Sequence, residues 1–285
     1  GCLARLRLPA WLNRWILRAY VRWYGVDTSE MVGTLADYES LETFFVRPLK
    51  DGLRPVNPAP EAIVSPVDGR VLLAARCPEG RLTLPGGQTC HVGHLLGEVR
   101  LPLDVEVAVL YLAPPDYHRI QHACEGGVRA VCCAPGRLWP VFPGAVRRVP
   151  ALFGRNERMV VQATHANGID FASVLVGAFG VGRISLSLWD RVSNEGPATP
   201  ELFRFEPPVS VNRGQEMGRF HMGSTVVLVF PAGEMAWEIR AGDRLRVTRP
   251  AGRVILGSQV SSFPAILNQA RRGGRALPAE VARTT

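Results

Sequence analysis

The chain has 285 residues, of which 47% are hydrophobic, so it can bury a sizeable core as one large domain or two small ones. Its formal net charge of +8 at pH 7 comes almost wholly from arginine, because Lys50 is the only lysine. This composition excludes a disordered chain, limits amine chemistry that needs a pocket lysine, and favours an anionic partner such as nucleic acid or a lipid surface.

Residues 9–25, PAWLNRWILRAYVRWYG, have the spacing of a single amphipathic helix. The large apolar residues that share one predicted face are Leu12, Trp15, Ile16, Ala19 and Trp23. The arginines that form a row at i, i+4 and i+8 are Arg14, Arg18 and Arg22. Two interpretations are open from the pattern alone. The helix lies on a lipid surface, or it packs on its own domain with a solvated arginine row.

A second short helix is predicted in residues 40–49, SLETFFVRPL, with Ser40 as the N-cap and an end before Pro48. The proline-rich stretch RPVNPAPEAIVSP that follows has the character of a linker. We therefore expect residues 1–55 to form an N-terminal helical segment and residues 56–265 to form the main domain. No window offers 18 or more uncharged apolar residues, so no membrane-spanning helix is expected.

From about residue 62 onward, β-branched runs broken by Gly, Pro and Asp predict strands. The runs cover residues 62–76, 105–114, 158–164, 171–189, 224–230, 243–248 and 252–257. Few helical patterns intervene, so a doubly wound sheet is not expected. We predict an α+β chain with a β-rich core of mixed topology behind the N-terminal helices. The final residues, 266–285, lack an apolar pattern and are expected to form a loose tail.

Six cysteines occur at positions 2, 77, 90, 124, 132 and 133 without CxxC spacing. The adjacent pair Cys132 and Cys133 is poorly placed for an ordinary disulfide or a zinc site, so we expect reduced thiols and no metal. Cys124 lies near two histidines in the sequence, but no local signature supports it as a nucleophile.

Three short stretches collect the side chains that could carry chemistry. They are SPVDGRV with Asp68, PPDYHRIQHACEG with Asp116, His118 and His122, and FHMGST with His221, Ser224 and Thr225. Alone, each has a simpler interpretation: a hairpin turn, a structural histidine, and a turn before a strand. Together they contain the Asp, His and Ser of a site in which a base takes the serine proton and a carboxylate orients the base. No G-x-S-x-G motif is present, so an ordinary α/β-hydrolase is not expected.

Six longer motifs follow one another along the chain. They are ETFFVRPL, SPVDGRV, YLAPPDYHR, LFGRNERMV, VGAFGVGRI and RGQEMGRFHMGSTVVLVF. In order and wording they resemble the motifs of the phosphatidylserine decarboxylases of bacterial type. The resemblance covers roughly residues 10–230, and the stretch from Gly214 to Thr225 is its most specific part.

The resemblance implies a proenzyme that cuts itself between Gly223 and Ser224. The Ser224 hydroxyl would attack the carbonyl of Gly223, and elimination from the resulting ester would leave residues 1–223 and 224–285 as two associated chains. Ser224 would become a covalent pyruvoyl group, with Thr225 beside it. That group would accept the electrons released when phosphatidylserine loses CO₂ and becomes phosphatidylethanolamine. Glycine at 223 suits this chemistry because it leaves the path to the carbonyl unhindered.

The resemblance also implies roles for the remaining site residues. Asp68 and a histidine would complete the Asp-His-Ser group for self-cleavage, and His118 would serve the decarboxylation. Family members have their second histidine where this chain has Gln121, with His122 one position later, and glutamine cannot act as a base at neutral pH. Three outcomes stay open: His122 takes the role through a loop or bulge, His118 serves both steps, or self-cleavage is slow or absent. His221 is a further candidate base.

A substrate that stays in a bilayer favours the lipid-surface interpretation of residues 9–25. The resemblance therefore implies a peripheral protein on the cytoplasmic face of the cell membrane that binds phosphatidylserine. A homodimer stays an open alternative.

Three other functions are alternatives to phosphatidylserine decarboxylation. SPVDGRV and RAGDRLRVTRPAGRVILG resemble the halves of a lipoyl- or biotinyl-type hairpin fold, but neither contains the lysine that such a carrier needs. Nucleic-acid binding is not expected, because the arginines are dispersed and no aromatic RNA-binding signature is present. The third alternative, motivated by Gln121, is a processing-deficient relative that binds anionic phospholipid without turnover.

Overall fold

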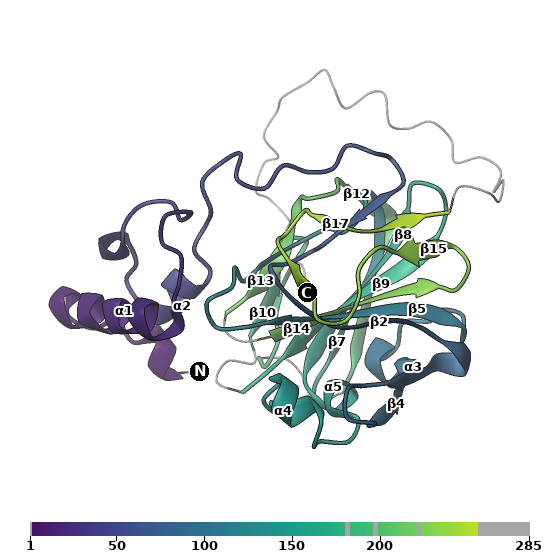
Figure 1. The fold of residues 1–285 in the computed structure, drawn as a ribbon, viewed down its shortest axis with the longest axis horizontal. Coiled ribbons are helices and arrows are strands. Elements are labelled where there is room, and N and C mark those ends of the chain that lie inside the picture. The colour runs from purple at the N-terminus through teal and green to yellow at the C-terminus, as the bar shows by residue number, and fades with distance from the viewer. Residues whose placement is uncertain (1, 180–182, 196–198, 222–223, 256–285) are drawn as a thin grey trace, which may run out of the picture.

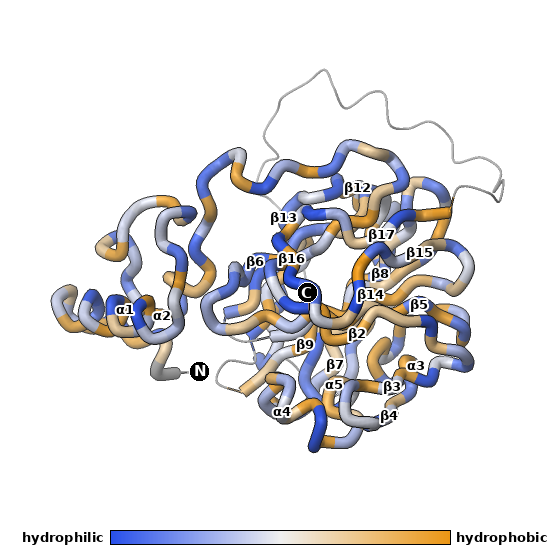
Figure 2. Tube along the Cα trace, viewed as in Figure 1, coloured by the Kyte–Doolittle hydropathy of each residue, from blue (hydrophilic) through white to orange (hydrophobic). Residues whose placement is uncertain are grey.

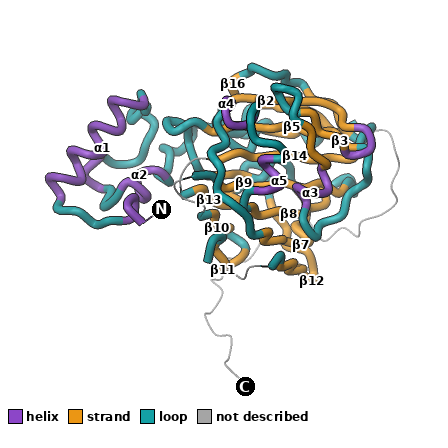
Figure 3. Tube along the Cα trace, turned by 90° about the horizontal axis from the view of Figure 1, so that it is seen from below, coloured by secondary structure: helices purple, strands orange, loops and turns teal. Residues whose placement is uncertain are grey.

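The computed structural model describes residues 2–179, 183–195, 199–221 and 224–255. Gly223, the expected cleavage point, and the expected tail, 266–285, lie outside these residues. Within them, an N-terminal helical segment stands beside a body of strands, and Figures 1 and 3 both show its two α-helices to one side of that body.

Helix α1, Ala10–Tyr24, forms where the sequence predicts it. It begins directly after Pro9, which cannot be accommodated inside a helix without breaking a hydrogen bond. It ends at Gly25, whose left-handed φ of 68° turns its N–H toward the carbonyl of Val21. A glycine tolerates this conformation without the steric cost that a side chain would add.

Helix α2, Leu41–Phe45, begins at the predicted N-cap Ser40. The Ser40 hydroxyl accepts a hydrogen bond from the Thr43 N–H, and the Thr43 hydroxyl accepts one from the Ser40 N–H. The helix ends before Pro48, as predicted. Two short 3₁₀ helices complete this segment: η1, Cys2–Arg5, and η2, Leu35–Asp37.

The faces of α1 differ from the sequence-based expectation. Its buried residues are Asn13 and Leu17, and Leu17 packs in a small apolar cluster that includes Phe44 of α2. On the predicted apolar face, Trp15 and Trp23 are 66% and 85% exposed. Figure 2 shows hydrophobic and hydrophilic residues interleaved along this helix. The helix therefore packs on its own chain through Asn13 and Leu17, and not through the tryptophan face that the sequence predicts.

The body of the molecule is built around an eight-stranded sheet in the order β12-β7-β8-β9-β14-β5-β2-β16. Its strands are β2 Gly69–Cys77, β5 Val105–Leu112, β7 Gly126–Ala134, β8 Arg158–His165, β9 Asp170–Gly177, β12 Glu201–Val211, β14 Ser224–Pro231 and β16 Arg244–Leu245. Strand β14 lies inside this sheet and pairs antiparallel with both β5 and β9.

Three smaller sheets and three helices complete the body. A four-stranded sheet contains β11 Trp189–Val192, β10 Ile184–Leu186, β13 Glu216–Phe220 and β6 Arg119–Gln121. The others are β1 Ala62–Val64 with β17 Pro250–Val254 and β15 Met235–Trp237, and the pair β3 Arg81–Thr83 with β4 Thr89–His91. The helices are α3 Val92–Leu96, α4 Pro143–Val146 and α5 Leu152–Arg155, with η3 Pro78–Gly80.

The predicted α+β class with a β-rich core is confirmed. Among the described residues, every pair of named strands runs antiparallel. The mixed strand topology that we expected is therefore not found among them, although many neighbouring strands are not consecutive in the chain. No helix of the described chain is long and apolar enough to cross a bilayer.

The two faces of β14 bury into different apolar clusters. Val226 and Leu228 lie in a cluster with Ile120 of β6, which we call the inter-sheet core. Val227 lies in a second cluster, with Leu95 of α3 and Phe153 of α5. Because side chains alternate along a strand, even-numbered residues of β14 face the inter-sheet core and odd-numbered residues face the helices.

The hairpin interpretation of Asp68-Gly69 is wrong, because the two flanking strands belong to different sheets. Strand β1 pairs with β17, whereas β2 pairs with β5 and β16. The two stretches that resemble the halves of a lipoyl- or biotinyl-type fold do lie side by side, since residues 62–64 pair with residues 250–253. Asp68 thus lies at a crossing between sheets.

Candidate active site

Ser224 is the first residue of β14 and lies in the row Leu112, Ser224, Gly177 across three adjacent strands. It is fully buried, and its Oγ has no hydrogen-bond partner among the described residues. Its even-numbered position places its side chain on the side of Val226, toward the inter-sheet core. A buried hydroxyl without a partner is costly to fold, which is typical of a group kept for chemistry.

His118 precedes β6 and is also fully buried. Its Nδ1 lies 2.8 Å from the carbonyl oxygen of Asp116, and its ring packs on Phe45 of α2 with centroids 4.0 Å apart. Since a carbonyl only accepts, Nδ1 carries the proton and donates, which leaves the lone pair on Nε2. That Nε2 has no partner in the part of the chain that the structure describes, and burial lowers the pKa of His118 to about 3, so the ring is a neutral proton acceptor at pH 7.

His122 follows β6 and extends the pairing of β6 with the segment that leads into β13. Its N–H donates to the Gln215 carbonyl, and its own carbonyl accepts from the Gly214 N–H. It is 1% exposed, its Nε2 finds no partner within the described ranges, and burial lowers its pKa to about 4. His118, Ile120 and His122 alternate along one side of the strand, toward the inter-sheet core.

Gln121 lies on the opposite side of β6, where it pairs in register with Glu216. The irregularity between β6 and β13 falls at Met217, between Glu216 and Gly218, and leaves β6 itself regular. No bulge therefore turns His122 toward the side of Gln121. Strand alternation directs the side chains of His118, His122 and Ser224 toward the inter-sheet core, and no hydrogen bond joins them in the described chain.

Asp68 is held by two partners. Its Oδ2 lies 3.1 Å from the guanidinium of Arg54, and its Oδ1 accepts from the Val247 N–H at 2.7 Å. The same guanidinium of Arg54 also forms an ion pair with the Glu30 carboxylate, 2.7 Å away. Asp68 makes no hydrogen bond to a histidine in the described chain, so the structure does not assemble the Asp-His pair that the resemblance implies.

Gly69 explains why Asp68 nevertheless lies near Ser224. A Cβ at Gly69 would lie 2.5 Å from the carbonyl oxygen of Tyr111, so only glycine lets β2 start this close to β5. Gly69 is thereby brought beside Leu112, which is the strand partner of Ser224. With a strand spacing of about 4.8 Å, the backbones at Gly69 and Ser224 are about 10 Å apart.

His221 belongs to a separate polar cluster just before the unplaced residues 222–223. Its Nε2 lies 3.0 Å from Ser185 Oγ, and its Nδ1 lies 3.3 Å from Glu42 of α2. Glu42 also accepts from Arg183 at 2.9 Å. Sequence reasoning missed Ser185, Arg183 and Glu42, because they are far from His221 in the chain and only the fold brings them together.

The remaining candidates have other environments. Thr225 is fully buried with an unpartnered Oγ1, on the side of β14 that faces the helices. Burial raises the pKa of the Cys124 thiol in the inter-sheet core, which makes it unreactive. Among the described residues no group of three or more His, Cys, Asp or Glu could hold a metal ion.

A buried serine hydroxyl facing the same interior as two neutral, unpartnered imidazoles is typical of enzymes that activate a hydroxyl group. The comparisons with known proteins agree. The family model described as phosphatidylserine decarboxylase matches residues 41–253. The chain belongs to the phosphatidylserine decarboxylase family.

Curated relatives support this membership over most of the chain. The phosphatidylserine decarboxylase proenzyme of Anaeromyxobacter sp. (strain K) is 40% identical over 259 residues, covering 88% of this chain and 91% of that protein. The proenzyme of Marinobacter nauticus is 38% identical, covering 81% of this chain and 82% of that protein. The proenzyme of Pseudomonas fluorescens is 35% identical, covering 88% and 90%.

Proposed function

We propose that this protein is a self-cleaving enzyme that decarboxylates phosphatidylserine to phosphatidylethanolamine and CO₂. The single observation that carries the proposal is Ser224, fully buried and unpartnered at the start of β14, within a chain whose family consists of decarboxylase proenzymes. The role of each residue below is part of the same proposal.

Self-cleavage begins when a base takes the proton of the Ser224 hydroxyl. The oxygen then forms a bond to the carbonyl carbon of residue 223, and the bond from that carbon to the Ser224 nitrogen breaks while the nitrogen gains a proton. Loss of the Ser224 α-proton next expels residues 1–223 as a carboxylate. Water finally replaces the nitrogen on the shorter chain, and ammonia leaves.

His118 is the base that we assign to the first step. Its Nδ1 donates to the Asp116 carbonyl, which leaves Nε2 to take a proton. This nitrogen lies on the side of β6 that faces the inter-sheet core, as Ser224 does. His122 lies on the same side and provides a second acceptor, whereas Gln121 lies on the other. Asp68 stabilises the site from the end of β2, through Arg54 and the Val247 N–H.

A pyruvoyl group made from Ser224 supplies a carbonyl that accepts the electron pair released when the carboxylate leaves as CO₂. The residues present fit such a group, because Ser224 is shielded from solvent. Converting its hydroxyl to a carbonyl also breaks no hydrogen bond within the described chain. The chain also lacks a lysine that could hold another electron sink, since Lys50 is its only lysine and its Nζ donates to the Ser29 carbonyl.

The two chains stay associated after cleavage in this proposal. Strand β14 belongs to the C-terminal product, yet it pairs along its length with β5 on one side and β9 on the other, both from the N-terminal product. Separating the chains would break both ladders and expose the apolar residues between them, which is unfavourable.

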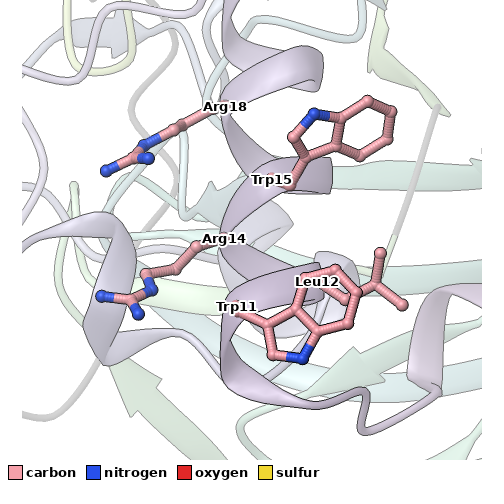
Figure 4. Close-up of a pocket in the computed structure, with 5 residues that line it drawn as sticks. All are labelled: Trp11, Leu12, Arg14, Trp15 and Arg18. Atoms are coloured by element: carbon pink, nitrogen blue, oxygen red, sulfur yellow. The ribbon is translucent and has the colours of Figure 1, made fainter.

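The proposed substrate surface is an anionic membrane, contacted peripherally through α1. Figure 4 shows Trp11 and Trp15 directed away from Arg14 and Arg18, around a surface pocket that these residues line with Leu12. Exposed tryptophans beside arginines are typical of helices that lie in the headgroup region. The free thiols of the described cysteines favour the cytoplasmic face.

The test is release of CO₂ from phosphatidylserine labelled at the serine carboxyl group, presented in mixed micelles. The purified protein should release label, and Ser224→Ala should release none. Binding of the lipid by both proteins without release from either would instead identify the processing-deficient alternative, in which the chain only binds anionic phospholipid.

A further inference from the structure

Arg47, two residues after α2, is a buried cation with most of its hydrogen-bonding capacity unused. It is 3% exposed, and its guanidinium carbon lies 5.2 Å from the centre of the Phe44 ring. One nitrogen donates to the Pro115 carbonyl at 2.9 Å, while Nε and the other terminal nitrogen are buried without a partner among the residues that the structure describes. Burying a guanidinium whose nitrogens lack partners is strongly unfavourable, so an anion is expected there.

The other buried arginines of the described chain show how unusual this is. Arg158 donates from all three of its nitrogens to backbone carbonyls. Arg213 leaves only its Nε without a partner in the described chain, because its terminal nitrogens donate to carbonyls of the linker and one of them lies 3.3 Å from Glu125. No carboxylate of the described chain lies within 4.0 Å of Arg47, and burial lowers its pKa.

The surroundings of Arg47 place it between the membrane-facing helix and the histidines. Its neighbour Phe45 packs on His118. The Pro115 carbonyl that it bonds belongs to the loop that leads from β5, where Leu112 pairs with Ser224, to His118. The preceding carbonyl of that loop, at Pro114, accepts from Tyr20 of α1. One loop thus connects α1, Arg47 and the reactive residues.

A phosphatidylserine molecule has its charges in a fixed order. The acyl chains stay in the bilayer, the phosphodiester follows, and the serine amine and carboxylate are at the far end. If α1 contacts the bilayer and the amine reaches Ser224, the phosphodiester must lie between them, where Arg47 is. The substrate carboxylate is a poor partner for this cation, because an ion pair that stabilises it in the ground state opposes its departure.

We propose that Arg47 is the binding residue for the phosphodiester of the lipid substrate, which takes up the two guanidinium nitrogens left without partners. This inference rests on the proposed function. It makes Arg47 a headgroup-binding residue and assigns it no part in self-cleavage.

The experiment measures binding of dihexanoylphosphatidylethanolamine by calorimetry, below its micelle concentration, to the purified wild-type protein. This probe carries the phosphodiester, lacks the carboxylate, and is not decarboxylated, so the result does not depend on turnover. Arg47→Met keeps the apolar stem against Phe44 and removes the charge. Arg47→Lys keeps the charge and removes the planar fork.

We expect Arg47→Met to weaken binding by about tenfold or more, since charge-assisted hydrogen bonds to an anion are lost, and Arg47→Lys to have an intermediate affinity. The control Arg81→Met removes one exposed arginine from the β3 edge and should bind as wild type does. Intact mass and thermal unfolding of each variant show whether it is cleaved and folded.

The outcomes separate the two proposals. If wild type releases CO₂ and Arg47→Met, cleaved and folded, binds the probe with unchanged affinity, the phosphodiester assignment is wrong and the decarboxylase proposal stands. If wild type binds the probe in an Arg47-dependent manner but releases no CO₂, the decarboxylase proposal fails and the phosphodiester site stands. Equal weakening by Arg81→Met would show a bulk charge effect and would overturn the assignment.

Discussion

Neutral burial of His118 and His122 makes the stability of the uncleaved chain depend on pH. In the unfolded chain both imidazoles have an ordinary pKa near 6.5, whereas in the folded chain burial lowers these values to about 3 and about 4. Below pH 6.5 the unfolded state therefore binds protons that the folded state does not. Each histidine contributes stability that is present above pH 6.5 and is lost as the pH falls toward its folded pKa.

The magnitude follows from the pKa differences. Between pH 7 and pH 5 each histidine lowers the unfolding free energy by about 2 kcal/mol, so the pair lowers it by about 4 kcal/mol. Buried carboxyl groups act in the opposite direction, because burial raises the pKa of Asp116 and Glu157. The total pH dependence thus mixes both signs, and only a difference between variants isolates the histidines.

The assay is urea unfolding of Ser224→Ala, which removes the self-cleavage hydroxyl and keeps one chain, at pH 7 and pH 5. His122→Asn is added to this background, and His118→Asn separately. Each second substitution should reduce the loss of unfolding free energy between the two pH values by about 2 kcal/mol. The exposed His94→Asn serves as the control and should leave that loss unchanged.

A pH dependence that is the same with and without His122 would refute the reasoning, because it would show that this imidazole titrates alike in the folded and unfolded chains. The same result for His118 would remove the evidence that it is neutral at pH 7. The assignment of His118 as the base would then lose its electrostatic support.

Three further predictions concern self-cleavage and membrane contact. Gln121→Ala should cleave within about twofold of wild type, because this side chain lies on the far side of β6, and a loss as large as that of His118→Asn would contradict the geometry. Glu42→Gln, which removes the carboxylate beside His221, should lower the His221 pKa in an NMR titration, and an unchanged titration would contradict the contact. Trp15→Glu should reduce cosedimentation with phosphatidylglycerol vesicles about tenfold, whereas Leu103→Glu, at an exposed apolar site away from α1, should not; equal effects would exclude a specific role for the helix.

Local signals predicted the two N-terminal α-helices well, whereas the short helices α3, α4 and α5 of the body were not predicted. Ser40 is the N-cap of α2, and the helix ends before Pro48, because capping and proline geometry act within a few residues. The face of α1 was harder to predict. Asn13 is buried because its side chain donates to the Tyr38 carbonyl, a partner 25 residues away that periodicity does not reveal.

The strands show the same division. The run at 224–230 predicts β14, since its β-branched residues are buried on both faces. The edge strand β12 was missed, because Pro207 and Pro208 interrupt its pattern and prolines in strands are confined to edges and bulges. Its pairing with β7 comes from distant parts of the chain.

The sequence predicted which residues form the candidate site better than it predicted the contacts that those residues make. Ser224, His118 and His122 were identified from residue type and resemblance, and the fold directs all three toward the inter-sheet core. Neither Arg47 nor the Arg54 partner of Asp68 was identified. Their significance depends on burial and on unpaired nitrogen atoms, which no spacing in the sequence records.

The central claim is that Ser224 cuts the chain and becomes a reactive carbonyl. The most direct test is the intact mass of the purified protein under denaturing conditions, with Ser224→Ala beside it. We expect two species, residues 1–223 and residues 224–285. The shorter one should be blocked at its N-terminus and carry a carbonyl in place of the Ser224 amine. The variant should remain one full-length chain. A single full-length species from both proteins would contradict the claim.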